Sequence, residues 1–345
     1  MFKNISRKRI IITLACILLF IALSILIVVF TPITIPSDSD DMISFYTRNK
    51  PNVKLSVSVI TPDETNITVY GHDGRVKEKD NTVYELGGVT KTFTGALTAR
   101  AVLNGELSLT TSVKDVLPVP IAVYVPTIGD LVTQTSAYAD FTPEKFGKKL
   151  NPYSGMNDFD VLMAMGEFNP TYDGPYIYSD SDYGISILGT ALGDLYSESF
   201  ITVLNDFIHM DLGLRNTYVA TGSDKPSHGY KWLVSDAYIA SSGLTSTIDD
   251  MTNYLKMILN QSIDYFKLAL SPLKEINEEN EVGYLWIISK SSGVAGSYGQ
   301  TSHYSSAILV DIDSGYGVVV LSNYPDDSYG SVYEIANKLM SDLHG

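Results

Sequence analysis

A glycine stands where the spacing of the surrounding residues would suit a nucleophile. Residues 84–102 read YELGGVTKTFTGALTARAV, which places Lys91 three residues after Gly88. A lysine one helical turn from a hydroxyl side chain can help to activate that hydroxyl for attack on a carbonyl group. Gly88 carries no side-chain atom, so it cannot form an acyl-enzyme. The chemistry that this spacing suggests therefore lacks its nucleophile.

Other reactive residues do not form a recognisable metal or thiol site. Cys16 is the only cysteine, and it lies in an apolar run near the amino terminus. The rest of the chain therefore has neither a disulfide framework nor a thiolate metal site. The histidines show no HExxH-type spacing, which argues against a zinc enzyme of that class. They are His72, His209, His228, His303 and His344. We expect no metal and no cofactor.

The helices that must position Lys91 are predicted by hydrophobic periodicity. Thr90 to Leu103 places apolar residues at i, i+4 and i+8 and stops at an Asn-Gly pair, which predicts a buried helix. Tyr183 to Tyr196 repeats the pattern after Ser and Asp residues that can cap a helix. A last helix is expected at about Val332 to Leu343.

Strands are expected at both ends of the folded part. Val53 to Ile60 and Ile67 to Tyr70 alternate polar and β-branched residues around a turn, which predicts a hairpin. Ala307 to Ile312 and Gly317 to Ser322 are apolar runs joined by Asp-Ser-Gly-Tyr, which predicts a second hairpin. Strands at both ends with helices between them favour one sheet built from the two termini and a helical insertion, an α/β (α+β) fold.

Six segments in one order resemble the serine β-lactamase-like family, which includes class C β-lactamases, low-molecular-mass penicillin-binding proteins and related esterases. Residues 84–118 resemble the active-site segment of that family. The later segments are VPTIGDLVTQTSAY, YIYSDSDYGISILG, DLGLRNTYV, IASSGLTSTIDDMTNYL and GSYGQTSHYSSAILVDIDSGYGVVVLSN. The resemblance runs from about residue 50 to the end. It implies a β-lactamase/penicillin-binding-protein-like fold, with a mixed, mostly antiparallel sheet flanked by helices, and acyl transfer through a serine ester.

The first two motifs of that family fall on altered residues. In the Ser-x-x-Lys motif the serine attacks and the lysine helps to take its proton; the matching positions are Gly88 and Lys91. In the Tyr-x-Asn motif the phenol shuttles a proton and the amide holds the substrate and the lysine. The matching positions are Tyr178 and Asp180. The lysine and the phenol are retained, whereas the serine and the amide are not.

The third motif, Lys-Thr-Gly or His-x-Gly, brings a cation to the substrate carboxylate and a backbone amide to the oxyanion hole. Its positions here are Ser297, Tyr298 and Gly299, so the cation is absent. All three motifs are therefore altered. We interpret the chain as a naturally degenerate member of the family, a pseudoenzyme, rather than an engineered inactive variant.

Asp180 also predicts the state of the remaining lysine. An ionised carboxylate beside Lys91 raises the pKa of the lysine, which is the wrong direction for a general base at neutral pH. We therefore predict a Lys91–Asp180 salt bridge. Tyr178 and Lys91 are retained either because they pack and hydrogen-bond or because they recognise a ligand.

The alternative is an active serine-type hydrolase, such as a β-lactamase, D-Ala-D-Ala peptidase or esterase, with a displaced nucleophile. Thr90, Ser179 and Ser297 lie in or beside the motifs, although the family geometry turns the middle residue of each motif into the protein. His303 is either a base in the cleft or an ordinary loop histidine. If the chain is a pseudoenzyme, its site residues are the six motif positions Gly88, Lys91, Tyr178, Asp180, Ser297 and Gly299.

The amino terminus predicts a membrane anchor. Ile10 to Phe30 is an uncharged apolar run, long enough at about 1.5 Å per helical residue to cross a bilayer core of roughly 30 Å. Basic residues precede the run and aspartates follow it, so residues 1–9 are expected in the cytoplasm. A cleaved signal peptide is the alternative, but the run is long for such a peptide and no small-x-small cleavage site follows.

Residues 31–41 combine proline, serine and aspartate and are expected to form a linker. Residues 42–345 are then one extracytoplasmic domain. The whole chain has a net charge of −15, and without the four basic residues of the tail 20 Lys and Arg face 39 Asp and Glu, a net charge of −19. Nucleic acid is therefore not an expected partner. The function that we predict is non-catalytic binding or regulation at a bacterial cell envelope, directed at a cell-wall fragment, a peptide or a partner protein.

Overall fold

The computed structural model of the protein describes residues 36–119, 124–138, 151–166, 174, 176–222, 226, 228–328 and 330–345. Ser37–Gly345 form one compact unit. The predicted cytoplasmic tail, the predicted membrane helix at 10–30 and most of the predicted linker lie outside the described residues. Within the described ranges, no helix has the length and apolar character needed to cross a bilayer.

Helix α2 (Ser39–Thr47) corrects the predicted end of the linker at residue 41. The side chain of Asp38 caps this helix by accepting hydrogen bonds from the backbone of Asp40 and Asp41. These two aspartates also lie in the first turn, where the helix dipole favours negative charge. The acidic stretch that suggested a tether is thus the amino-terminal cap of a helix.

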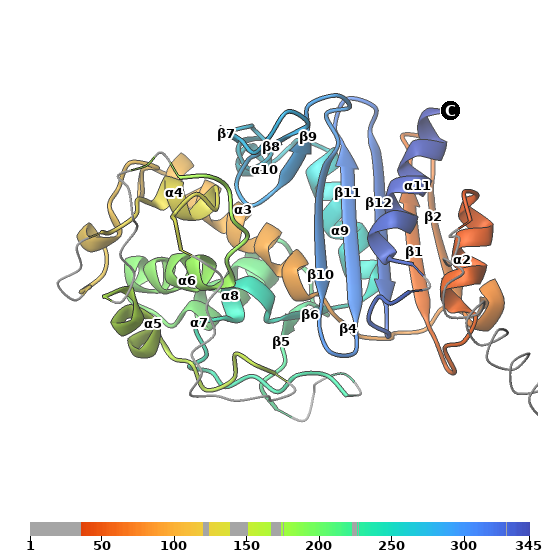
Figure 1. Cartoon of the computed structure of the whole chain (residues 1–345), viewed down its shortest axis with the longest axis horizontal. Coiled ribbons are helices and arrows are strands. Elements are labelled where there is room, and N and C mark those ends of the chain that lie inside the picture. Colours follow the sequence, from red (N-terminus) through yellow and green to blue (C-terminus); the bar gives the residue numbers. More distant parts are fainter. Residues whose placement is uncertain are drawn as a thin grey trace, which may run out of the picture. The chain divides into compact units, whose positions relative to one another are not determined.

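The described strands form a large antiparallel sheet and a small one (Figure 1). The large sheet has the order β3-β2-β1-β12-β11-β10-β9-β8-β7. Its strands are β1 (Leu55–Ile60), β2 (Thr65–Tyr70), β3 (Val76–Lys77), β7 (Lys274–Glu275), β8 (Asn280–Val282), β9 (Ile287–Ser289), β10 (Ala295–Gln300), β11 (Ser305–Asp311) and β12 (Tyr316–Ser322). The small sheet has the order β4-β6-β5, with β4 (Tyr84–Glu85), β5 (Tyr218–Val219) and β6 (Leu244–Ser246).

Both predicted hairpins are confirmed, and β1 from the amino-terminal part pairs with β12 from the carboxyl-terminal part. The prediction of one sheet built from both ends is therefore confirmed. All pairings among the described strands are antiparallel, so the predicted mixed character of the sheet is not found there.

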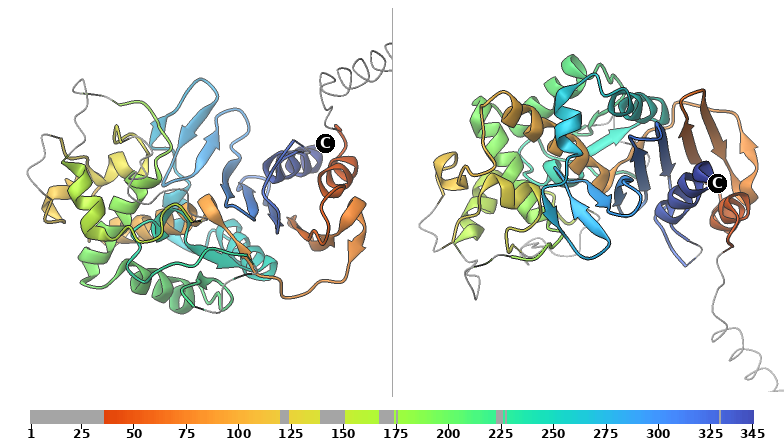
Figure 2. Two further views of the ribbon diagram at one scale, coloured as in Figure 1. Left: turned by 60° about the horizontal axis from the view of Figure 1, so that its bottom comes forward. Right: turned by 90° about the horizontal axis from the view of Figure 1, so that it is seen from above.

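Helices cover the two faces of the large sheet. Helices α2 and α11 (Val332–His344) pack side by side on one face, as both views in Figure 2 show. Their apolar residues form a core with alternate residues of β1, β11 and β12. Helix α9 (Ile248–Leu259) packs on the opposite face, which belongs to the larger core. The predicted last helix is confirmed and ends one residue later.

The chain between β4 and β7 contributes the helical insertion. Its helices are α3 (Thr90–Leu103), α4 (Ile128–Val132), α5 (Asp158–Met165), α6 (Asp182–Tyr196), α7 (Phe200–Asp206), α8 (Ile239–Ser242), α9 and α10 (Asp264–Ala269). Short helical turns occur at η1 (His72–Gly74), η2 (Gly87–Val89), η3 (Val113–Asp115) and η5 (Phe207–Asp211). Helix α3 matches the predicted bounds and is almost wholly buried, so it fixes the position of the residues at its amino terminus.

Candidate functional site

Gly88 lies in η2, the short turn that leads into α3. Two contacts hold this turn against the neighbouring strands. The backbone N–H of Leu86 donates to the carbonyl of Leu244 in β6 at 2.9 Å, and the hydroxyl of Ser306 in β11 donates to the carbonyl of Leu86 at 2.6 Å. The first motif is therefore anchored to both sheets.

Strand β10 lies against η2 at the distance of backbone contact. A Cβ atom built on Gly88 would lie 2.5 Å from the carbonyl oxygen of Tyr298, well inside any normal contact. Gly87, with φ +48°, would place a Cβ 2.9 Å from the backbone nitrogen of Gln300. On the strand, a Cβ at Gly299 would overlap the backbone of Leu86 and Gly88. Three glycines thus allow this approach, and the space for a side chain at residue 88 is taken by backbone.

Lys91 lies in the first turn of α3 and is held by two carboxylates. Its Nζ lies 2.5 Å from Oδ1 of Asp180 and 2.9 Å from Oδ1 of Asp182. The lysine side chain is 10% exposed, that of Asp182 is 16% exposed, and that of Asp180 is 61% exposed. The predicted Lys91–Asp180 salt bridge is present, and a second, more buried carboxylate strengthens it.

The surroundings keep Lys91 charged and Tyr178 neutral. Burial alone would lower the pKa of Lys91, but Asp182 and Asp180 outweigh burial and raise the pKa above its ordinary value. Burial, assisted by the charge of Asp180, raises the pKa of Tyr178 to about 12. At neutral pH neither group is in the deprotonated form that a general base requires.

Asp182 and Gln134 belong to this site although the sequence did not single them out. The hydroxyl of Tyr153 donates to Oδ2 of Asp182 at 2.7 Å, which orients the carboxylate toward Lys91. Gln134 holds the second motif through its backbone carbonyl, which accepts from the N–H of Ser179 at 2.9 Å, and through Oε1, which accepts from the N–H of Ser181 at 2.7 Å.

A sequence signal existed for both of these residues. Asp182 follows Asp180 by two positions, and Gln134 lies in the segment VPTIGDLVTQTSAY, which matched the family. Their roles depend on tertiary contacts between separate segments, which residue type and spacing alone do not reveal.

The third motif brings backbone atoms to the site but no positively charged side chain. In β10, Ser297 and Gly299 pair with Ile308 and Ser306 of β11 and face α3, whereas Tyr298 pairs with Ala307 and faces α11. The ring of Tyr298 packs against Tyr333 on that side, with centroids 6.2 Å apart. The backbone carbonyl of Tyr298, and not its ring, lies against the first motif.

The proposed substitute nucleophiles occupy different environments. Thr90 is fully buried, and its hydroxyl accepts from the N–H of Leu244 at 3.2 Å. Ser179 is exposed and Ser297 is half-buried in β10. The expectation that the middle residue of each motif points into the protein is therefore wrong for Ser179, which precedes Asp180 on an exposed stretch of chain.

A comparison with models of protein families shows to which family the chain belongs. The model of the beta-lactamase family matches residues 53–336. The chain belongs to the beta-lactamase family. All the motif positions described above, from Gly88 to Gly299, lie inside the matched range.

Curated relatives match at low identity. The chain is 25% identical over 301 residues to protein flp of Staphylococcus aureus (strain MW2), covering 78% of this chain and 59% of flp. It is 26% identical over 266 residues to a beta-lactamase of Providencia stuartii, covering 72% of this chain and 66% of that protein. The chain therefore spans less than two thirds of the length of either relative.

Solved structures of the family share the fold. A beta-lactamase/D-alanine carboxypeptidase from Yersinia pestis, crystallised with citrate, matches with a TM-score of 0.75 at 16% identity, covering 88% of this chain and 95% of that one. A penicillin-binding protein homologue from Pyrococcus abyssi, described as octameric, matches with a TM-score of 0.70 at 20% identity, covering 85% and 73%. At these identities the likeness establishes the beta-lactamase fold alone.

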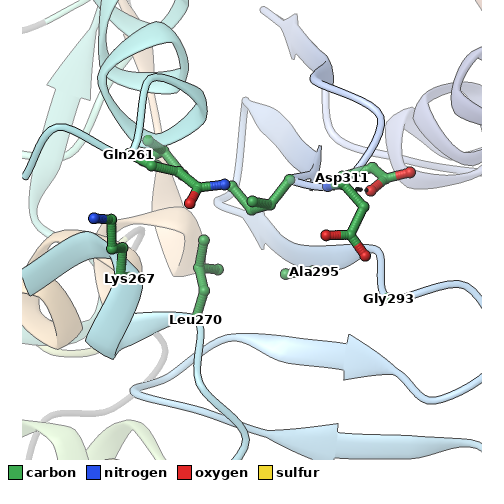
Figure 3. Close-up of a pocket in the computed structure, with 9 residues that line it drawn as sticks. Gln261, Lys267, Leu270, Gly293, Ala295 and Asp311 are labelled. Carbon is green, nitrogen blue, oxygen red and sulfur yellow. Dashed lines mark hydrogen bonds between the residues drawn. The ribbon is translucent and has the colours of Figure 1, made fainter. Parts of the chain in front are cut away.

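A cavity elsewhere in this beta-lactamase-like unit does not involve the motifs. It has a volume of about 210 Å³ and lies between the end of α9, helix α10 and the start of β10 (Figure 3). Its walls include Gln261, Lys267, Leu270 and Asp311. None of the six predicted site residues lines it, so it carries no argument about the family chemistry.

Proposed function

We propose that the protein is a non-catalytic member of the beta-lactamase family that acts by binding at the cell envelope. The observation that carries this proposal is the contact between residue 88 and strand β10. Residue 88 has no nucleophile, and a side chain there would meet the Tyr298 carbonyl at 2.5 Å. Loss of the serine is therefore accompanied by closure of the space that its side chain would use.

The ion pairs of Lys91 support the same conclusion. A serine mechanism needs a lysine or phenol that can accept the serine proton near neutral pH. Asp180 and Asp182 favour the protonated lysine, and burial favours the neutral phenol of Tyr178. The ion pairs with Asp180 and Asp182 give Lys91 a structural role in joining α3 to the second motif.

The proposed ligand is a cell-wall peptide or an envelope protein. The name of the Yersinia pestis neighbour includes D-alanine carboxypeptidase, which supports a peptide of the cell wall as the first candidate. A binder with this fold but without the nucleophile would hold such a peptide without cleaving it. One proposed use of such non-catalytic binding is self-protection of the cell against a compound that targets its wall.

The proposed location is the outer face of the membrane. The apolar run at residues 10–30 supports a single-pass anchor with the amino terminus in the cytoplasm. An anchored binder has a high effective concentration for partners at the same surface. Cell fractionation tests this part: the chain should remain in the membrane fraction after a high-salt wash and be released by detergent. Release by salt alone would contradict the anchor.

The binding role can be tested with a cell-wall pentapeptide that ends in D-Ala-D-Ala. Detergent-solubilised full-length protein is titrated with this peptide by calorimetry, and the mixture is then analysed by mass spectrometry. We expect saturable binding and an unshortened peptide. Catalytic release of D-alanine would contradict the non-catalytic proposal, whereas absence of binding would contradict the choice of cell-wall peptide as ligand.

A further inference from the structure

A groove runs along one side of helix α11, on the face of the large sheet that carries α2 and α11. It has a volume of about 580 Å³. One wall is a stripe of α11 with the spacing of a single helix face, formed by Tyr333, Asn337, Ser341 and His344. The floor is formed by β9, β10 and β11, and β10 and β9 continue the sheet beyond α11 (Figure 1). The groove therefore lies where a third helix would extend the helical layer on this face.

The middle of the floor is apolar and open. Gly296 in β10 pairs with Ile287 of β9 on one side and with Leu309 of β11 on the other, and all three residues line the groove. A Cβ atom on Gly296 would lie 2.5 Å from Cδ2 of Leu309. A glycine inside a strand often marks a place where a ligand or another backbone comes close. Here it keeps the centre of the floor free of a side chain.

The pairing of the floor strands favours a helix over an extended chain as the occupant. Strand β10 is paired with β9 and β11, β9 is also paired with β8, and β11 with β12. An extended peptide takes its main-chain hydrogen bonds from an unpaired sheet edge, and the described strands of the floor offer no such edge. A helix satisfies its own backbone groups and lays apolar side chains into a groove.

One end of the groove carries two aromatic rings. Tyr333 lines this end and packs against Tyr298, with ring centroids 6.2 Å apart. The two residues are 36% and 38% exposed. Exposed tyrosines are enriched at protein interfaces, because the ring supplies apolar contact area while the hydroxyl remains hydrated. This end suits the apolar face of a partner.

The other end of the groove is negative. Asp311 and Asp313 line it near the carboxyl end of α11, where the helix dipole adds a negative partial charge. Asp311 is paired with His344 at 2.8 Å, whereas no ion pair of Asp313 is found among the described residues. Of the described residues that line the groove, none is a lysine or an arginine. The charge of this end is therefore complementary to a basic partner, which the acidic chain as a whole also attracts.

We propose that this groove binds a basic amphipathic α-helix of a partner protein, with the apolar face of that helix on the floor and its basic residues beside Asp313. The stripe from Tyr333 to His344 spans about 16 Å at 1.5 Å per residue, so about three turns of the partner helix would contact α11. The groove lies on the opposite face of β10 from α3. The inference therefore goes beyond the proposed function and is tested separately from it.

The test uses full-length protein in phosphatidylcholine nanodiscs and a fluorescein-labelled, amidated 14-residue peptide of leucine and lysine. The leucines follow the i, i+3, i+4 and i+7 pattern of an amphipathic helix. Fluorescence anisotropy measures binding above that of empty nanodiscs. We expect saturable binding of this peptide, and at least tenfold weaker binding of a peptide with the same composition but no such periodicity.

Four variants of the protein locate the binding surface. Ser341→Arg should weaken binding at least tenfold, because it places bulk and positive charge in the groove. Ser262→Arg is the matched control and should bind like the natural chain, since Ser262 is exposed between α9 and α10 and does not line the groove. Asp313→Asn should weaken binding about threefold and reduce its dependence on salt. Asp63→Asn, in the exposed turn between β1 and β2, should change neither.

Photocrosslinking gives a second readout. A benzophenone at one leucine position of the peptide should label residues of β9, β10 or α11 beside the groove, as mapped by mass spectrometry of proteolytic fragments. An unchanged limited-proteolysis pattern confirms that the variants are folded. Binding that is absent, that is equal in the natural chain and in Ser341→Arg, or that labels another surface would overturn the proposal. A dimer of the natural chain that is lost in Ser341→Arg would also overturn it, because the groove would then belong to a second copy.

Discussion

The carbonyl oxygen of Tyr298 lies 2.5 Å from the position that a Cβ atom of residue 88 would occupy. Residue 88 is the position at which the sequence resemblance predicts the family nucleophile, and Tyr298 belongs to strand β10. Glycine is thus required by the present backbone, in addition to being chemically inert. Restoring a serine demands that the strand or the turn moves.

Gly88→Ser should therefore destabilise the protein. Overpacking against a rigid backbone group typically costs about 1–3 kcal/mol. The free energy of unfolding, measured by urea denaturation, reports this loss directly. Gly166→Ser is the matched control, because among the described residues the nearest atom to a Cβ at Gly166 is the carbonyl oxygen of Met163 at 3.5 Å. A Gly88→Ser protein as stable as the Gly166→Ser protein would contradict the close approach.

Lys91→Met should destabilise the protein strongly, because it leaves Asp182 buried and Asp180 nearby without a counter-charge. Breaking a buried ion pair by removing one partner costs about 3–5 kcal/mol. Asp180 is exposed, so its ion pair with Lys91 contributes less to the free energy of unfolding. Asp180→Asn should therefore cost about 1 kcal/mol or less. Urea denaturation of both variants checks this order.

The double variant Lys91→Met/Asp182→Asn separates the ion pair from the packing of the lysine stem. It should recover most of the stability lost in Lys91→Met, since the buried carboxylate is then removed as well. A double variant no more stable than Lys91→Met would show that the charges are not the source of the loss.

The pair His344–Asp311 should make stability depend on pH through the last helix. Nε2 of His344 lies 2.8 Å from Oδ2 of Asp311. The backbone carbonyl of Met340, followed by Asp311, raises the pKa of His344 above its ordinary 6.5. Although burial opposes it, hydrogen bonding from Ser314 and His344 lowers the pKa of Asp311 below 3.8.

The direction of the pH dependence of stability follows from these two pKa shifts. A raised histidine pKa stabilises the fold fully below about pH 6.5 and loses this effect as the pH rises through the folded value. A lowered aspartate pKa stabilises above about pH 3.8 and loses its effect as the pH falls. The stability difference between the natural chain and His344→Gln should be largest between these limits and shrink above neutral pH. A difference that grows from pH 6 to pH 8 in urea denaturation would contradict the pairing.

Local patterns were sufficient for much of the fold. The bounds of α3 and the hairpin β11–β12 follow from residue periodicity and turn residues that lie close together in the sequence. The start of α2 was missed, because aspartates that cap a helix have the same composition as a polar linker. Capping could be recognised only together with the apolar residues of α2 that follow.

The site was predictable only as far as motif positions allowed. The pairing of Lys91 with Asp180 follows from the motifs, whereas the contribution of Asp182 depends on where α6 begins. The approach of β10 to Gly88 is a tertiary distance that no residue pattern encodes.

Labelling by an active-site reagent tests the central claim most directly. Full-length protein is incubated with a fluorophosphonate and, separately, with a penicillin, and its intact mass is then measured beside that of Gly88→Ser. We predict no mass increase for the natural chain and none for Gly88→Ser, because the backbone of β10 occupies the space of the serine and Lys91 is held in its protonated form. A stoichiometric adduct on the natural chain, mapped to Thr90, Ser179 or Ser297, would contradict the account and would identify a working nucleophile.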